Sequence, residues 1–133
     1  MKKILTILIV FVGLIVSGCD KDKPILVLNS KAITKDTVNF PVQEFRKNQR
    51  INYALIVPKG FKDSVVRIQI IKKNEKVPNW GFKIYQSEDV CVDSTKQFYI
   101  DYFTIPEKGY YIMRAFEIRN LDKALAIADF WVK

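Results

Sequence analysis

The stretch Ser64-Val65-Val66-Arg67-Ile68-Gln69-Ile70-Ile71 carries the pattern on which the fold depends. Val66, Ile68 and Ile70 occupy alternate positions, and alternate side chains of a β-strand point to opposite faces of the sheet. The stretch therefore predicts a strand with one apolar face packed on a core. Residues 50–57 show the same alternation just before it. Their apolar face is formed by Ile51, Tyr53, Leu55 and Val57.

Short runs rich in Val, Ile, Tyr and Phe continue along the rest of the chain and are separated by turn residues, which is typical of an all-β protein. We expect further strands at 25–28, 37–42, 82–86, 97–104, 110–118 and 124–132. The last two flank a compact connection at 119–123, which predicts a terminal hairpin. In the last strand one side is formed by Ala124, Ala126, Ala128, Phe130 and Val132. A short helix at 121–129 is the alternative there, because this segment is rich in alanine.

About eight strands of this kind, each with one apolar side to cover, predict two packed antiparallel sheets. The chain has 133 residues and shows no internal repeat and no second-domain boundary. We therefore expect a single antiparallel β-sandwich over residues 25–133.

The N-terminal segment has the layout of a secretory signal. Lys2 and Lys3 precede an apolar run at 4–16, and small residues follow it. A transmembrane helix needs about 20 apolar residues. This run stops at Ser17, and four charged residues occupy 20–23. The segment therefore favours a cleaved signal peptide over a permanent span.

The run ends in Val16-Ser17-Gly18-Cys19, which resembles the lipobox of bacterial lipoproteins. The resemblance implies that Cys19 receives a diacylglyceryl group, that the chain is cut before it, and that fatty acids such as palmitate hold it on a membrane. We expect a signal peptide at 1–18, a lipidated tether at 19–24 and the sandwich at 25–133. The protein would be anchored in the cell membrane or outer membrane and face the periplasm or the exterior. An uncleaved anchor and an ordinary signal peptide are the alternatives.

A second resemblance concerns Ile105-Pro106-Glu107-Lys108-Gly109-Tyr110-Tyr111 and the two strands that follow. This ending resembles that of immunoglobulin-like domains in bacterial envelope proteins, although the Cys, Trp and Cys spacing of antibody domains is absent. In such domains a tyrosine hydroxyl bonds back to the backbone of the corner before its strand. The resemblance implies this role for Tyr111 and an opposite orientation for Tyr110.

The charge balance is basic, with 22 Lys and Arg against 14 Asp and Glu and a net charge of +8. Removal of the leader would leave about +6. Local basic clusters occur at 46–50, 59–62 and 72–76. We interpret them as solvated loops and strand ends, with contact to anionic lipid headgroups as the alternative. Nucleic acid is not an expected partner, because no groove-reading or base-stacking module is recognisable.

The composition argues against an enzyme. The chain has no histidine, which excludes Ser-His-Asp and Cys-His catalysis and the commonest zinc ligand. Its five glycines are scattered singly, so no phosphate-binding glycine loop is present. Glu88, Asp89, Asp93 and Asp101 lack the spacing of a calcium loop, and we interpret them as a solvated turn. We therefore expect no catalytic residue, no metal and no cofactor.

Cys91 remains as the single thiol once Cys19 is lipidated, so no internal disulfide can form. Because it lies between Val90 and Val92, we expect it to be a small buried hydrophobic residue. An intermolecular bridge or a reactive thiol is the alternative.

Tyrosine and tryptophan are numerous for a core of this size. They are Tyr53, Tyr85, Tyr99, Tyr102, Tyr110, Tyr111, Trp80 and Trp131. Trp80 lies in a polar loop beside Pro78 and Asn79, which makes it the candidate partner-binding residue. We expect a membrane-anchored, non-enzymatic binding or assembly module that holds a protein or cell-wall partner. The alternative is a small inhibitor or ligand-binding module that presents its loops to an envelope protease or a glycan.

Overall fold

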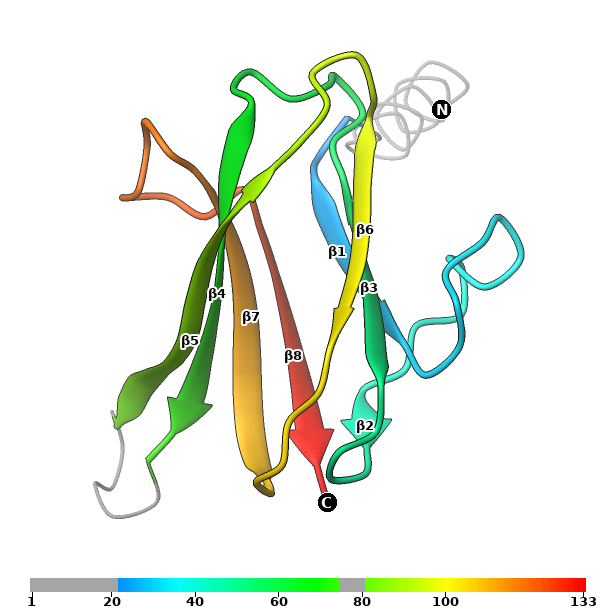
Figure 1. Cartoon of the computed structure of the whole chain (residues 1–133), viewed down its shortest axis with the longest axis vertical. Helices are drawn as coiled ribbons and strands as arrows, with labels where there is room; N and C mark the ends of the chain where they lie inside the picture. Colours follow the sequence, from blue (N-terminus) through cyan, green and yellow to red (C-terminus); the bar gives the residue numbers. More distant parts are fainter. Residues whose placement is uncertain (1–21, 75–80) are drawn as a thin grey trace, which may run out of the picture.

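The computed structural model describes residues 22–74 and 81–133, and these contain eight β-strands in two facing sheets (Figure 1). The strands are β1 (Ile25–Asn29), β2 (Glu44–Phe45), β3 (Ile51–Ile56), β4 (Val65–Lys73), β5 (Phe82–Cys91), β6 (Phe98–Phe103), β7 (Gly109–Glu117) and β8 (Ala126–Val132). One sheet has the order β1-β3-β6, and the other has the order β2-β8-β7-β4-β5.

The topology confirms a single immunoglobulin-like β-sandwich. All strand pairs are antiparallel except β2 with β8, which run parallel for two residues. The chain changes sheet at every connection except those between β4 and β5 and between β7 and β8. These crossings place sequential strands on opposite layers, as in the Greek-key connections of immunoglobulin-type sandwiches. The expected terminal hairpin is β7 with β8, so the alternative of a helix near the end of the chain is wrong.

The alternation of apolar residues specifies the core. Val66, Ile68 and Ile70 of β4 are buried, whereas the intervening Arg67 and Gln69 lie half-buried on the outer face. Strand β3 contributes a second row to the core, as the sequence predicts: Ile51, Tyr53 and Leu55, followed by Val57. Full burial of one such side chain stabilises the fold by roughly 1.5–3 kcal/mol. The two sheets are therefore held together mainly by these facing rows.

Tyr111 anchors the corner between β6 and β7 in the way the sequence predicts. Its ring is fully buried and stacks on Phe130 with ring centroids 5.4 Å apart. Its hydroxyl donates a 2.6 Å hydrogen bond to the carbonyl oxygen of Glu107. Burial raises the pKa of this hydroxyl well above its usual value. Tyr110 faces the opposite way, where its hydroxyl donates to Asp129 at 2.7 Å.

Two strand predictions need correction. The expected strand at 37–42 is wrong, because this segment forms turns in which the Thr34 and Thr37 hydroxyls bond to nearby backbone groups. Threonine side chains that bond locally compete with a strand ladder. Strand β5 is longer than the five residues expected at 82–86, since it continues to Cys91. It pairs only with β4 and is mostly exposed on both faces, so its side chains show no apolar alternation.

The connections between strands gather at two opposite ends of the sandwich. At one end, β1 begins at Ile25, which pairs with Ile56 at the end of β3. At the other end, β8 finishes beside the start of β7, and the loop between β2 and β3 bonds to the loop before β7, with Asn48 N–H donating to Ile105 at 2.8 Å. Figure 1 shows the first end at the top and the second end, with the chain terminus, at the bottom. Residues 22–24 and the last residue of the chain therefore lie at opposite ends of the sandwich.

Candidate functional site

The residues that the sequence singles out for function lie outside the described residues. These are the lipobox Val16, Ser17 and Gly18, the lipidation residue Cys19, and the partner-binding candidate Trp80. Asp22 and Lys23, at the start of the described chain, are exposed and lead directly into β1. Within 22–74 and 81–133, no helix is long and apolar enough to cross a membrane.

The acidic residues are dispersed over β5 and its neighbours. Glu88 and Asp89 belong to β5 itself and not to a turn, and Asp89 forms a 2.8 Å salt bridge with Arg67. The Arg67 guanidinium lowers the pKa of this carboxyl. Asp93 instead accepts hydrogen bonds from the side chain and backbone of Thr95. In the part of the chain that the structure describes, no group of three metal-ligating side chains comes together.

Cys91 corrects the sequence analysis. It is exposed at the end of β5, whereas Val90 and Val92 on either side of it are buried. The pattern Val-Cys-Val suggests that all three residues are buried, but successive residues of a strand face opposite sides of the sheet. Two buried valines therefore place the cysteine between them on the outer face.

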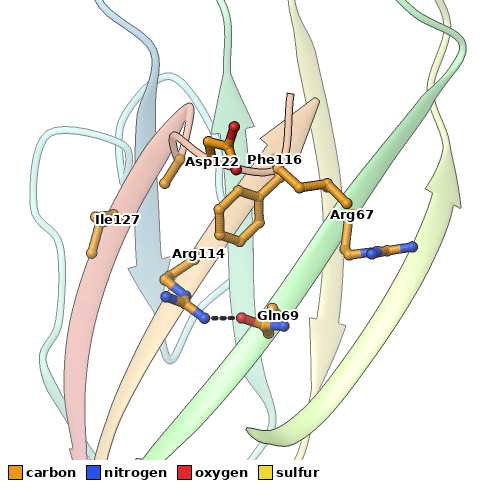
Figure 2. Close-up of a pocket in the computed structure, with 8 residues that line it drawn as sticks. Arg67, Gln69, Arg114, Phe116, Asp122 and Ile127 are labelled. Carbon is orange, nitrogen blue, oxygen red and sulfur yellow. Dashed lines mark hydrogen bonds between the residues drawn. The ribbon is translucent and has the colours of Figure 1, made fainter. Parts of the chain in front are cut away.

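A pocket of about 410 Å³ opens on the outer face of the five-stranded sheet, close to the connection between β7 and β8. Its floor is formed by Gln69 of β4 and Arg114 of β7, which are direct partners in the strand register. Figure 2 shows the Arg114 guanidinium pointing at the Gln69 amide, to whose oxygen it donates a hydrogen bond. The guanidinium also lies 5.2 Å from the ring centre of Phe116. Leu121 and Ile127 form exposed apolar walls.

Arg114 is half-buried and its hydrogen-bonding capacity is only partly satisfied. Its Nε atom is cut off from solvent and has no hydrogen-bond acceptor among the described residues. Arg67 lines the same pocket, but its own carboxylate partner is Asp89. Guanidinium groups bind carboxylates and phosphates well, because their planar donors match two acceptor oxygens. The pocket is thus chemically suited to a small anionic group.

A row of aromatic side chains crosses the same face nearer the other end of the sheet. The rings of Trp131 and Tyr110, opposite each other on β8 and β7, have centroids 4.8 Å apart. Phe82 of β5 continues the row, 6.4 Å from Tyr110. Trp131 is 47% exposed and Phe82 is 42% exposed. The row therefore presents aromatic surface to solvent while the core is filled by other residues.

The aromatic row borders a cleft of about 580 Å³ at the end of the sheet. Trp131 lines it together with Lys73 of β4, Lys83 of β5 and Lys108 of the loop before β7. Lys72 also lines the cleft, where it forms a 2.6 Å salt bridge with Glu107. This volume lies within the roughly 300–1,000 Å³ of ligand pockets. The cleft thus combines an exposed indole ring with several ammonium groups.

Neither Trp131 nor Arg114 stands out in the sequence as a site residue, and Trp131 is only one of eight Tyr and Trp residues. Gln69 and Arg114 are 45 residues apart and meet only through the pairing of β4 with β7. The lysines of the cleft come from three separate segments, which are β4, β5 and the loop before β7. A local sequence pattern carries no signal for either site, because both depend on strand register and on loops that converge at one end.

No family model and no curated protein matches the chain. Among solved structures, it is similar to the PmoD soluble domain from Methylocystis sp. ATCC 49242 (Rockwell), with a TM-score of 0.53 and 14% identity. That match covers 85% of this chain and 93% of the other. A β-glucosidase from Kluyveromyces marxianus also matches, with a TM-score of 0.41 and 14% identity over 85% of this chain and 14% of that one. The first similarity supports the β-sandwich fold and does not extend to a ligand or an activity.

Proposed function

We propose that this chain is a non-enzymatic binding module of a bacterial cell envelope, anchored in a membrane through lipid on Cys19. The module would hold a protein or cell-wall partner on an exposed face of its sandwich. The anchoring part of the proposal rests on the sequence of the leader, with its lipobox at Val16-Ser17-Gly18-Cys19. Two or more acyl chains hold a protein durably on a bilayer, whereas one chain gives marginal binding.

The observation that carries the binding role is the exposed row of Trp131, Tyr110 and Phe82. Aromatic rings contribute strongly to interfaces, because they bury a large apolar area with few rotatable bonds. The interior of the sandwich does not need these three rings, since its core already contains six other aromatic residues. These are Phe45, Tyr53, Phe61, Phe103, Tyr111 and Phe130. Exposed Trp131 is therefore better explained by a partner than by folding.

The non-enzymatic part of the proposal rests on residue chemistry. The whole sequence lacks histidine. Asp89 of β5 is paired with Arg67, and Asp93, two residues after β5, accepts hydrogen bonds from Thr95. A purified chain with measurable turnover of an envelope substrate, lost on substitution of either carboxylate, would contradict it.

Anchoring is tested by fractionation of cells that express the full chain. The wild type should be recovered with membranes and released by detergent, whereas Cys19→Ala should lose its acyl groups and appear in the aqueous fraction. Cys91→Ala is the matched control, because it removes the other thiol and should leave fractionation unchanged. Equal membrane retention of Cys19→Ala and wild type would refute lipid attachment at Cys19.

Partner binding is tested by cross-linking in intact cells. Trp131→Ala should lose the cross-linked partner, and Trp80→Ala tests the residue that the sequence favoured. Phe40→Ala is the control, because Phe40 is a 73% exposed aromatic residue in the loop before β2, away from the row. Loss of the partner in Phe40→Ala together with retention in Trp131→Ala would refute the proposed surface.

A further inference from the structure

The positive charge of the domain is concentrated at one end. We define the basic end as residues 44–50, 72–74, 81–83 and 104–108 together with Lys133. It holds eight Lys and Arg side chains against two Glu, a local charge of +6. The other described residues hold ten basic and ten acidic side chains, so they are neutral overall. The whole excess charge of the described residues therefore lies at the basic end.

Most of these cations form no salt bridge with a described carboxylate. Lys72 and Lys133 are paired with the two glutamates of the basic end, Glu107 and Glu44, at 2.6 Å and 3.0 Å. The remaining six form no salt bridge with any described residue and are exposed. They are Arg46, Lys47, Arg50, Lys73, Lys83 and Lys108. Like charges gathered at one end attract an anionic partner and repel one another in its absence.

The tether does not account for this charge. It enters at the start of β1, and the strands run from that end to the basic end. β4 covers this length with nine residues, or about 26 Å for the eight steps of about 3.3 Å between them. Exposed charges interact over a Debye length of about 8 Å at physiological salt. When the strands stand perpendicular to the membrane, lipid headgroups at the tether are thus too far from the basic end to be its partner.

An exposed aromatic ring and several cations lie close together at the basic end. Trp131, 47% exposed, lines the same cleft as Lys73, Lys83 and Lys108. A second cation and ring meet on the other sheet, where the Arg50 guanidinium lies 3.8 Å from the ring centre of Tyr102. A concave site with an exposed indole fits a sugar polymer better than a flat bilayer. The aromatic face can stack on a sugar ring, while the ammonium groups pair with acidic substituents of the sugars.

We propose that the basic end binds a polyanionic glycan of the cell envelope, a sugar polymer that carries carboxylate or phosphate groups. Trp131 stacks on a sugar ring in the cleft, and Lys73, Lys83 and Lys108 pair with the acidic groups on either side of it. The glycan is the partner that the proposed binding module holds, at the end of the domain opposite its tether.

The test measures binding of the full-length chain, purified in detergent micelles, to polygalacturonate. Neutral dextran, polyglutamate and vesicles containing phosphatidylglycerol are the comparison probes. The triple variant Lys73→Gln, Lys83→Gln and Lys108→Gln should bind polygalacturonate at least about tenfold more weakly, since each charge near an anionic surface contributes appreciably. The matched control neutralises three exposed lysines outside the basic end, Lys59, Lys62 and Lys96, and should bind within about twofold of wild type.

Trp131 separates a glycan from a simple polyanion. Trp131→Ala should weaken binding to polygalacturonate about fivefold or more and leave binding to polyglutamate unchanged, whereas Trp131→Phe should retain most of the affinity. Equal affinity for polyglutamate, with no effect of Trp131→Ala, would overturn the proposal in favour of an acidic protein. Binding to vesicles but not to polygalacturonate would overturn it in favour of a bilayer, and binding to no probe would also overturn it. None of these results affects the fractionation of Cys19→Ala, so failure of the ligand and failure of the anchor are distinguishable.

Discussion

Removal of a single oxygen atom tests how far the corner at β6 and β7 stabilises the sandwich. Tyr111→Phe keeps the buried ring and its stacking on Phe130 but loses the 2.6 Å hydrogen bond to Glu107. A hydrogen bond of this kind contributes about 0.5–1.5 kcal/mol net. Because Glu107 is exposed and water can hydrogen-bond to its carbonyl group in the variant, we expect the free energy of unfolding to fall by about 1 kcal/mol. For a domain of this size that lowers Tm by roughly 4–8 °C.

The assay is urea denaturation of the full chain followed by tryptophan fluorescence, with the slope of the transition unchanged. Tyr110→Phe is the matched control, since it also loses one hydrogen bond, 2.7 Å to the exposed Asp129. Surface substitutions of this kind stay within about 0.5 kcal/mol. Tyr111→Ala, which also removes the ring, should cost about 3–5 kcal/mol. If Tyr111→Phe were no less stable than Tyr110→Phe, the corner bond would have no stabilising role.

Three other perturbations have defined outcomes. Burial raises the pKa of Tyr99 to about 12, and its hydrogen bond to Asp101 acts in the same direction. The pKa of tyrosine in the unfolded chain is about 10. The contribution of Tyr99 to the free energy of unfolding should therefore be fully present below pH 10 and decline as the pH rises towards 12. A denaturation midpoint that stays constant over this range would contradict the prediction, and Tyr99→Phe should reduce the decline. Gly60 has φ +80°, so Gly60→Ala should lower the unfolding free energy by about 1 kcal/mol in a urea titration, and no change would be inconsistent with that conformation. Exposed Cys91 should react with a maleimide in the native state, whereas labelling that requires denaturant would show that it is covered.

The strands with a regular apolar period were predictable from sequence, and so was the corner tyrosine. β3 and β4 are recognisable because one face of each enters the core, which forces apolar residues into alternate positions. Tyr111 is recognisable because a glycine turn and the start of a strand fix its place relative to the corner. Each of these two patterns lies within a short stretch of sequence, and the folded structure has the arrangement that the pattern predicts.

Other features depend on context that a local pattern does not contain. β2 has only two residues and forms because it lies beside the end of β8, where Glu44 pairs with Trp131, 87 positions later in the sequence. Cys91 belongs to an edge strand, and because Val90 and Val92 on either side of it face the core, its side chain faces solvent. The sequence shows basic clusters at 46–50 and 72–76 but not that they meet Lys83, Lys108 and Lys133 at one end, because these five segments come together only through the strand pairing.

If the chain is anchored through Cys19 as proposed, the opposite placement of the start of β1 and the basic end has a mechanical consequence. If the start of β1 is held while a ligand pulls on the far loops, the load runs along the strand axes. Ile25 to Asn29 are paired with β3 over their full length, so the hydrogen bonds between these strands are sheared together instead of being unzipped one by one. The sandwich is oriented to bear tension along its length.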